Sequence, residues 1–124
     1  MYSVQLLEHF QNPRNVGEVE GGTSVEMTNP ACGDIMRLSA LFRDNAVESV
    51  RYKVRGCTAS IAAGSVLTEL MLGLDIPRLR AIQAADIEAR LGGLEPASKH
   101  AAVLCVDALK RLIEAHRFQH PIGL

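Results

Sequence analysis

The chain has 124 residues, of which 48% are apolar and 22% charged, and its formal net charge is −1. This length and composition predict a single globular domain over residues 1–124, with a hydrophobic core of its own. The mixed charge argues against a nucleic-acid or membrane surface, since either normally shows a basic patch. The N-terminal MYSVQLLEHF lacks the basic and long apolar segments of a secretory signal, and the most apolar stretch is shorter than the roughly 20 residues of a membrane span. We therefore expect a cytoplasmic protein.

The first expected elements are a helix and a strand. Residues 2–10 (YSVQLLEHF) favour a short amphipathic helix with Val4, Leu7 and Phe10 near one side, and Pro13 helps to end it. The segment TSVEMT, which precedes NPACGD, is a candidate strand.

Two runs of alternating polarity follow. Every second residue from Met36 to Phe42 is apolar, which indicates a half-buried strand over residues 35–43. After a turn at RDNA, the apolar residues Val50, Tyr52 and Val54 alternate with basic ones. The two runs predict an antiparallel hairpin.

The second half of the chain has helical character. Residues 59–72 are rich in Ala, Leu and Met, Pro77 can begin a second helix (PRLRAIQAA), and DIEARL continues the helical region. Ser98 can cap a last helix from about Lys99 to His116. The expected fold class is α+β, a small three-stranded antiparallel sheet packed on one face by helices.

The chain has three cysteines, and disulfides are not expected in a reducing compartment. The cysteines are therefore expected to bind metal, to take part in sulfur chemistry or to be buried in the core. NPACGD places Cys32 and Asp34 two residues apart at a strand–loop junction, where both could reach one ion, although this spacing also occurs by chance. Cys57 begins a helix, whose N-terminus favours the thiolate; a small buried corner residue is the alternative. His100, near the start of the last helix, would by itself be read as a surface histidine.

The motifs EHFQNPRNVG, NPACGD and RGCTASIAAGS, in this order and spacing, resemble the iron–sulfur cluster scaffold family typified by IscU and the N-terminal domain of NifU. The resemblance runs from Tyr2 to the last helix and implies a SufE/NifU-like sandwich. It also implies that the protein is a carrier and not an enzyme. Such a carrier takes sulfur from a cysteine desulfurase and iron from a donor, assembles a [2Fe–2S] cluster, and passes it to apo-protein or carrier acceptors. Without an insertion before the last helix, the chain is closer to IscU than to the zinc-bearing SufU branch.

The family motifs can be carried over residue by residue. Cys32, Asp34 and Cys57 match the first cysteine, the aspartate and the second cysteine of the family, and His100 matches its histidine. The third cysteine, in many members a cluster ligand and the preferred persulfide acceptor, is replaced here by Ala101. Cys57 is then the remaining candidate for the sulfur acceptor. The Leu-Pro-Pro-Val-Lys segment of chaperone-dependent members is only partly reproduced in LEPASK, so an Hsp70-type chaperone partner stays open.

Three functions remain open at this point. The first is the cluster scaffold, with Cys32, Asp34, Cys57 and His100 holding iron or a labile cluster. The second is a zinc-binding scaffold-like or regulatory module that has lost cluster assembly, since the same four residues form a plausible tetrahedral zinc set and zinc could occupy the isolated protein. The third is a cysteine enzyme built on Cys57 and His100, for which neither a third orienting group nor an oxyanion motif is readable.

Cys105 is the reserve ligand. At about 100° per residue, the apolar arc of the last helix is centred close to 40° from Ala101, which is where Cys105 lies. It is also one turn, about 6 Å, along the axis from Ala101. The wheel therefore predicts a core residue, which would reach the site only if the helix shifted by one turn.

Overall fold

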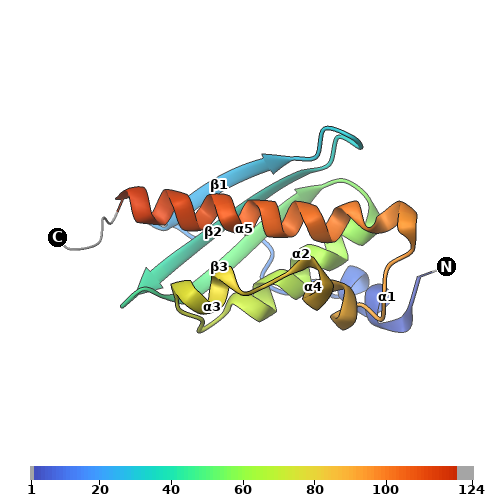
Figure 1. Ribbon diagram of the computed structural model, residues 1–124, viewed down its shortest axis with the longest axis horizontal. Coiled ribbons are helices and arrows are strands. Elements are labelled where there is room, and N and C mark those ends of the chain that lie inside the picture. The colour runs from blue at the N-terminus through green and yellow to red at the C-terminus, as the bar shows by residue number, and fades with distance from the viewer. Residues whose placement is uncertain (1, 120–124) are drawn as a thin grey trace.

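A computed structural model describes residues 2–119 (Figure 1). The sheet has the order β1-β2-β3, both pairs are antiparallel, and helices pack against one face. The expected α+β fold class is confirmed. The elements, in chain order, are α1 (Val4–Gln11), β1 (Thr23–Thr28), β2 (Ile35–Arg43), β3 (Ala46–Arg55), α2 (Thr58–Met71), α3 (Ile76–Arg80), α4 (Ala84–Arg90), the 3-10 helix η1 (Pro96–Ser98) and α5 (His100–Gln119).

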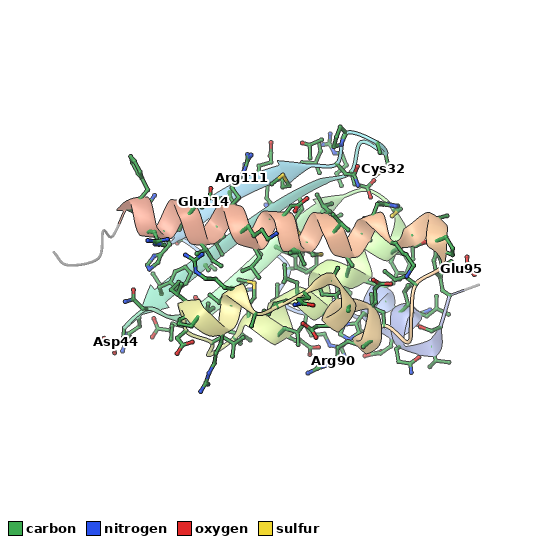
Figure 2. The ribbon with its side chains drawn as sticks, viewed as in Figure 1. Cys32, Asp44, Arg90, Glu95, Arg111 and Glu114 are labelled. Atoms are coloured by element: carbon green, nitrogen blue, oxygen red, sulfur yellow. The ribbon has the colours of Figure 1, made fainter. Side chains whose placement is uncertain are left out.

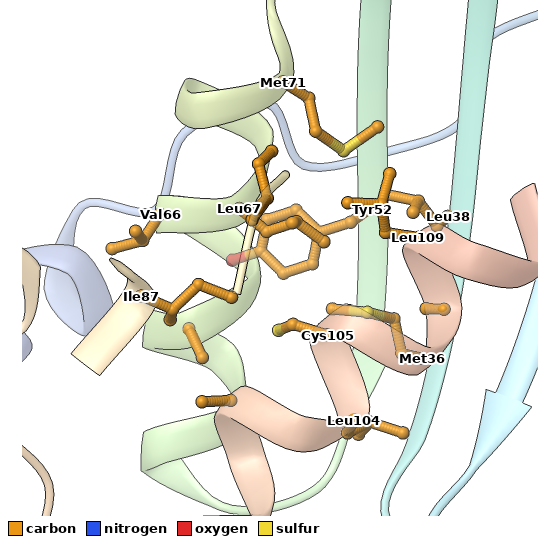
Figure 3. Close-up of a cluster of buried hydrophobic side chains, with 14 of the residues drawn as sticks. Met36, Leu38, Tyr52, Val66, Leu67, Met71, Ile87, Leu104, Cys105 and Leu109 are labelled. Atoms are coloured by element: carbon orange, nitrogen blue, oxygen red, sulfur yellow. The ribbon is translucent and has the colours of Figure 1, made fainter. Parts of the chain in front are cut away.

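The core lies between the sheet and the helices. Helix α5 crosses the sheet over β1 and β2, while α2 packs on β3 and on α5 (Figure 1). Tyr52 of β3 is 1% exposed and lies within the buried hydrophobic cluster (Figure 3). Its hydroxyl donates to the carbonyl of Ile61, 2.6 Å away. Helix α2 can come this close because Gly64 has no side chain. A Cβ at this position would lie only 2.3 Å from the Tyr52 ring. This packing fixes α2, and with it Cys57, against the end of the sheet.

The hairpin between β2 and β3 is tighter than the sequence indicated. Asp44 and Asn45 have φ of 55° and 62°, as in the two-residue turns that suit hairpins. Strand β3 therefore begins at Ala46, four residues before the expected start of alternation at Val50. A register shift at Leu41/Phe42 interrupts the alternation near the turn, so the period-two pattern is regular only farther along the strands.

The segment before β1 covers an edge of the sheet. The amide of Tyr52 donates to the carbonyl of Asn15, and the amide of Gly17 donates to the carbonyl of Tyr52, both at 2.9 Å. These bonds occupy backbone groups of β3 that would otherwise form an exposed strand edge. Asn15 and Gly17, which belong to the EHFQNPRNVG motif, therefore have a structural role at the edge of the sheet.

The predicted apolar face of the first helix is wrong. Val4 is 82% exposed, while Leu6, which the prediction left out, is 1% exposed. The helix is oriented by contacts of its opposite side with α2, where Nδ1 of His9 lies 2.8 Å from Oγ of Ser65. In a helix of only two turns, such contacts can outweigh the burial of the other apolar residues.

The remaining helices differ from the prediction mainly at their ends. The expected helix beginning at Pro77 stops at Arg80, and a new one starts at Ala84, because the carboxylate of Asp86 accepts from the amide of Gln83 and closes a capping box. Ser98 ends η1 instead of capping α5, which begins at His100. No helix in residues 2–119 is both long and apolar enough to cross a membrane.

Candidate metal centre

Three chain segments meet at one end of the sheet. The strand register brings the β1–β2 loop beside the β3–α2 junction, because Ile35 pairs with both Thr28 and Arg55. The residues that follow Arg55 therefore lie beside the loop that precedes Ile35. The start of α5 joins them through the packing of α5 on β1 and α2. Figure 2 shows Cys32 on this loop, at the end of the molecule where α5 begins.

The β1–β2 loop is a hydrogen-bonded turn that fixes Asp34. The amide of Asn29 donates to the carbonyl of Asp34, and the amide of Gly33 donates back to the carbonyl of Asn29, both at 2.8 Å. Gly33 has a φ of 78°, which residues with a side chain rarely adopt. The loop leaves Cys32 exposed and turns Asp34 inward, where it is 5% exposed.

The four residues predicted as ligands come together. Cys57 Sγ lies 3.3 Å from Asp34 Oδ2 and 3.6 Å from His100 Nε2. His100 Nε2 lies 3.5 Å from the same carboxylate oxygen. One donor atom from each of Cys32, Asp34 and His100 lies within 4.8 Å of the others. Cys32, Asp34 and His100 are thus close enough to share one ion. The Cys57 thiol is outside this three-residue group but contacts two of its members, Asp34 and His100.

Ser60 and Gly56 belong to this site and were missed in the sequence. Ser60 is 1% exposed; its Oγ donates to Asp34 Oδ2 at 2.5 Å and lies 3.3 Å from Cys57 Sγ. Gly56 is required by space, because a Cβ there would lie 2.5 Å from Asp34 Cγ. For Ser60 the available signal was its position three residues after Cys57, the N-cap of α2, because an N-cap side chain lies beside the residues of the first helical turn.

Hydrogen bonding keeps Asp34 ionised. Burial alone would raise the pKa of this carboxyl, but the hydrogen bonds from Ser60 and Cys57 act in the opposite direction, and the pKa is held below its ordinary value of 3.8. Asp34 is therefore a carboxylate at neutral pH, as a metal ligand must be.

Cys105 is placed in the core, as the helical wheel predicted. It is fully buried near Tyr52 and Met36, and burial raises the pKa of its thiol (Figure 3). Ala101, the residue at the position of the family's third cysteine, is also fully buried. Cys105, whose thiol is held in its neutral form by the apolar core, is a poor source of the thiolate that metals bind.

Thiol, carboxylate and imidazole donors gathered at one end of an α+β sandwich are typical of proteins that bind zinc, iron or an iron–sulfur cluster. The model of the NifU-like N terminal domain family matches residues 1–120. The chain belongs to this family, and the resemblance noted in its motifs is confirmed.

Relatives and solved structures agree with this assignment. The iron–sulfur cluster assembly scaffold protein IscU 1 of Archaeoglobus fulgidus is 40% identical over 114 residues, covering 91% of this chain and 74% of the relative. The protein named IscU in Escherichia coli is 35% identical over 121 residues, which cover 94% of each chain. The structure of the N-terminal part of a NifU-like protein from Brucella abortus superposes with a TM-score of 0.72, covering 94% of each chain at 21% identity, and shows the shared fold.

Proposed function

We propose that this chain is an iron–sulfur cluster assembly scaffold, which accepts sulfur, binds iron, and assembles and transfers a [2Fe–2S] cluster. The observation that carries the proposal is the convergence of Cys32, Asp34, Cys57 and His100 at one end of the sheet. The relatives named above are scaffold proteins by name, which supports the same reading. The cluster is cargo here, so the protein is a carrier rather than an enzyme.

The donor set fits this cargo in number and in kind. A [2Fe–2S] cluster takes four protein ligands, two for each iron, and histidine can replace cysteine. Cys32 is exposed and the His100 side chain is 27% exposed, so a cluster here could be built and handed over from solvent. We leave Cys105 out of the set because its side chain is enclosed by the core.

Cys57 is the proposed sulfur acceptor. Its Sγ would attack the outer sulfur of a persulfide on a cysteine desulfurase: the donor's S–S bond breaks, a new S–S bond forms on Cys57, and the donor cysteine leaves as a thiolate. The proton of Cys57 passes to His100 Nε2, 3.6 Å away. Reduction of the transferred sulfur to sulfide then needs two electrons from a separate reductant. The desulfurase, an iron donor and apo-protein acceptors are the proposed partners, in the cytoplasm, where thiols stay reduced.

A zinc-binding module is the second candidate, favoured by one observation. Ala101 replaces the third cysteine, and the four residues that remain form a sulfur, nitrogen and oxygen set that suits tetrahedral zinc. A cysteine enzyme is less well supported, because Cys57 and Asp34 both approach Nε2 of His100. In a Cys-His-Asp relay the nucleophile and the carboxylate use different ring nitrogens.

Anaerobic reconstitution separates the two candidates. The purified protein is incubated with ferrous iron, cysteine, a cysteine desulfurase and a dithiol reductant, which supplies the electrons for sulfide formation, and then desalted. We expect visible sulfur-to-iron charge-transfer absorption, with iron and sulfide bound in equal amounts. One tightly held zinc per chain, with no bound sulfide after this treatment, would instead support the zinc module.

A further inference from the structure

The hydroxyl of Ser60 lies under the candidate centre. Its Oγ contacts both Asp34 Oδ2, at 2.5 Å, and Cys57 Sγ, at 3.3 Å. The side chain is 1% exposed, so its donation is shielded from competing water. A buried hydroxyl that donates to a carboxylate forms a charge-assisted hydrogen bond, which is stronger than a neutral one.

Asp34 is held from two sides. Ser60 anchors Oδ2, and the backbone of Gly56 lies against the carboxyl, where a Cβ would be 2.5 Å from Cγ. The carboxylate therefore has little freedom to rotate. Its Oδ2 is the oxygen that Cys57 and His100 also approach.

Of the three groups around this oxygen, Ser60 has a distinct role. Cys57 and His100 belong to the proposed ligand set, so binding of a metal would redirect their sulfur and nitrogen toward the ion. The Ser60 hydroxyl can keep donating to Asp34 while the carboxylate binds metal. Hydrogen bonds of this kind orient a ligand before the ion arrives, and their loss typically lowers metal affinity 10- to 100-fold.

We propose that Ser60 is a positioning residue, which fixes the Asp34 carboxylate in the orientation that metal binding requires. This inference rests on the ligand set proposed above. The Ser60 side chain contacts both Asp34, at the end of the β1–β2 loop, and Cys57, at the start of α2. Through these two contacts it aligns ligands from separate parts of the chain.

The test measures the affinity of the purified protein for zinc, by competition with a chromophoric chelator, and the absorption of its cobalt form. We expect Ser60→Ala to lower zinc affinity about 10- to 100-fold and to weaken the thiolate-to-cobalt bands. Ser65→Ala is the matched control: Ser65 is also a buried serine of α2, bonded to His9 and to the amide of Arg14. Ser65→Ala should leave zinc affinity within about threefold of wild type.

A double-mutant cycle with Asp34→Ala distinguishes positioning from a general structural effect. If Ser60 acts through Asp34, Ser60→Ala lowers affinity in the wild type but has little further effect once Asp34 is Ala. Equal losses in both backgrounds, an unchanged affinity in Ser60→Ala, or the same loss in Ser65→Ala would each overturn the inference. If the wild-type protein binds neither zinc nor cobalt, the ligand set itself is wrong, and the inference fails with it.

Discussion

The contact between Gly56 and Asp34 offers a sharp test of how the site is built. In Gly56→Ala, the new Cβ would lie 2.5 Å from Cγ, 2.6 Å from Oδ1 and 2.9 Å from Oδ2 of Asp34. Carbon atoms in contact normally lie about 3.5–4.0 Å apart, so the carboxyl must move by about 1 Å. The hydrogen bond from Ser60, now 2.5 Å long, cannot survive such a movement unchanged.

The expected loss follows from that bond. A hydrogen bond to a charged group contributes about 1.5–3 kcal/mol, so Gly56→Ala should lower the free energy of unfolding of the metal-free protein by about this amount. The φ of Gly56 is not in the left-handed region, so the backbone itself accepts alanine. The assay is urea unfolding followed by circular dichroism, with zinc affinity measured in parallel.

The matched background is Asp34→Ala, which removes the atoms that the new Cβ would meet. There Gly56→Ala should be neutral, or stabilising by about 0.4–1 kcal/mol, because alanine restricts the unfolded chain more than glycine does. If Gly56→Ala lowers stability equally in both backgrounds, the clash with Asp34 is not the cause and the reasoning is wrong.

Three further predictions concern the core, the missing cysteine and acid stability. Gly64→Ala places a Cβ 2.3 Å from the Tyr52 ring and should lower the free energy of unfolding by about 1–3 kcal/mol in urea titrations; a wild-type midpoint would contradict the packing described. Ala101→Cys adds a thiol beside the proposed ligand His100, in the first turn of α5, and should slow the loss of a reconstituted cluster. The decay of the cluster's visible absorption measures this loss, and an unchanged decay would show that this position does not reach the cluster. Because the pKa of Asp34 is lowered on folding, its ionised form stabilises the protein at pH values above the ordinary 3.8, and this contribution is lost as the pH falls through the folded-state pKa. Wild type should therefore exceed Asp34→Asn in stability at neutral pH by more than it does in acid, and a difference independent of pH would contradict this account.

The secondary structure was predictable where a polar–apolar pattern extended over many residues and few tertiary contacts competed with it. The alternation from Met36 to Phe42 predicted β2, and the wheel of the last helix placed Cys105 in the core. The first helix was misread, because its orientation depends on a contact between His9 and Ser65, which lie 56 residues apart. A short helix offers too few apolar residues for their spacing alone to decide which side is buried.

In the candidate site, the metal-donor residues were predictable from the sequence, but the residues that support them were not. The donor residues were found because their chemistry is recognisable in short motifs that resemble a family. Ser60 and Gly56 were missed because their roles depend on how close they come to Asp34, more than 20 residues earlier in the chain. The register of β2 with β3 and the packing of α2 on the sheet bring these segments together, and a sequence motif does not report such distances.

The central claim is tested most directly by the iron and sulfide content of three proteins after anaerobic reconstitution with a cysteine desulfurase. We predict equal amounts of iron and sulfide in wild type and in Cys105→Ala, whose cysteine lies in the core, and loss of both in Cys57→Ala. Wild-type protein that holds zinc and takes up no sulfide, or a Cys57→Ala variant that assembles the cluster as well as wild type, would contradict the account.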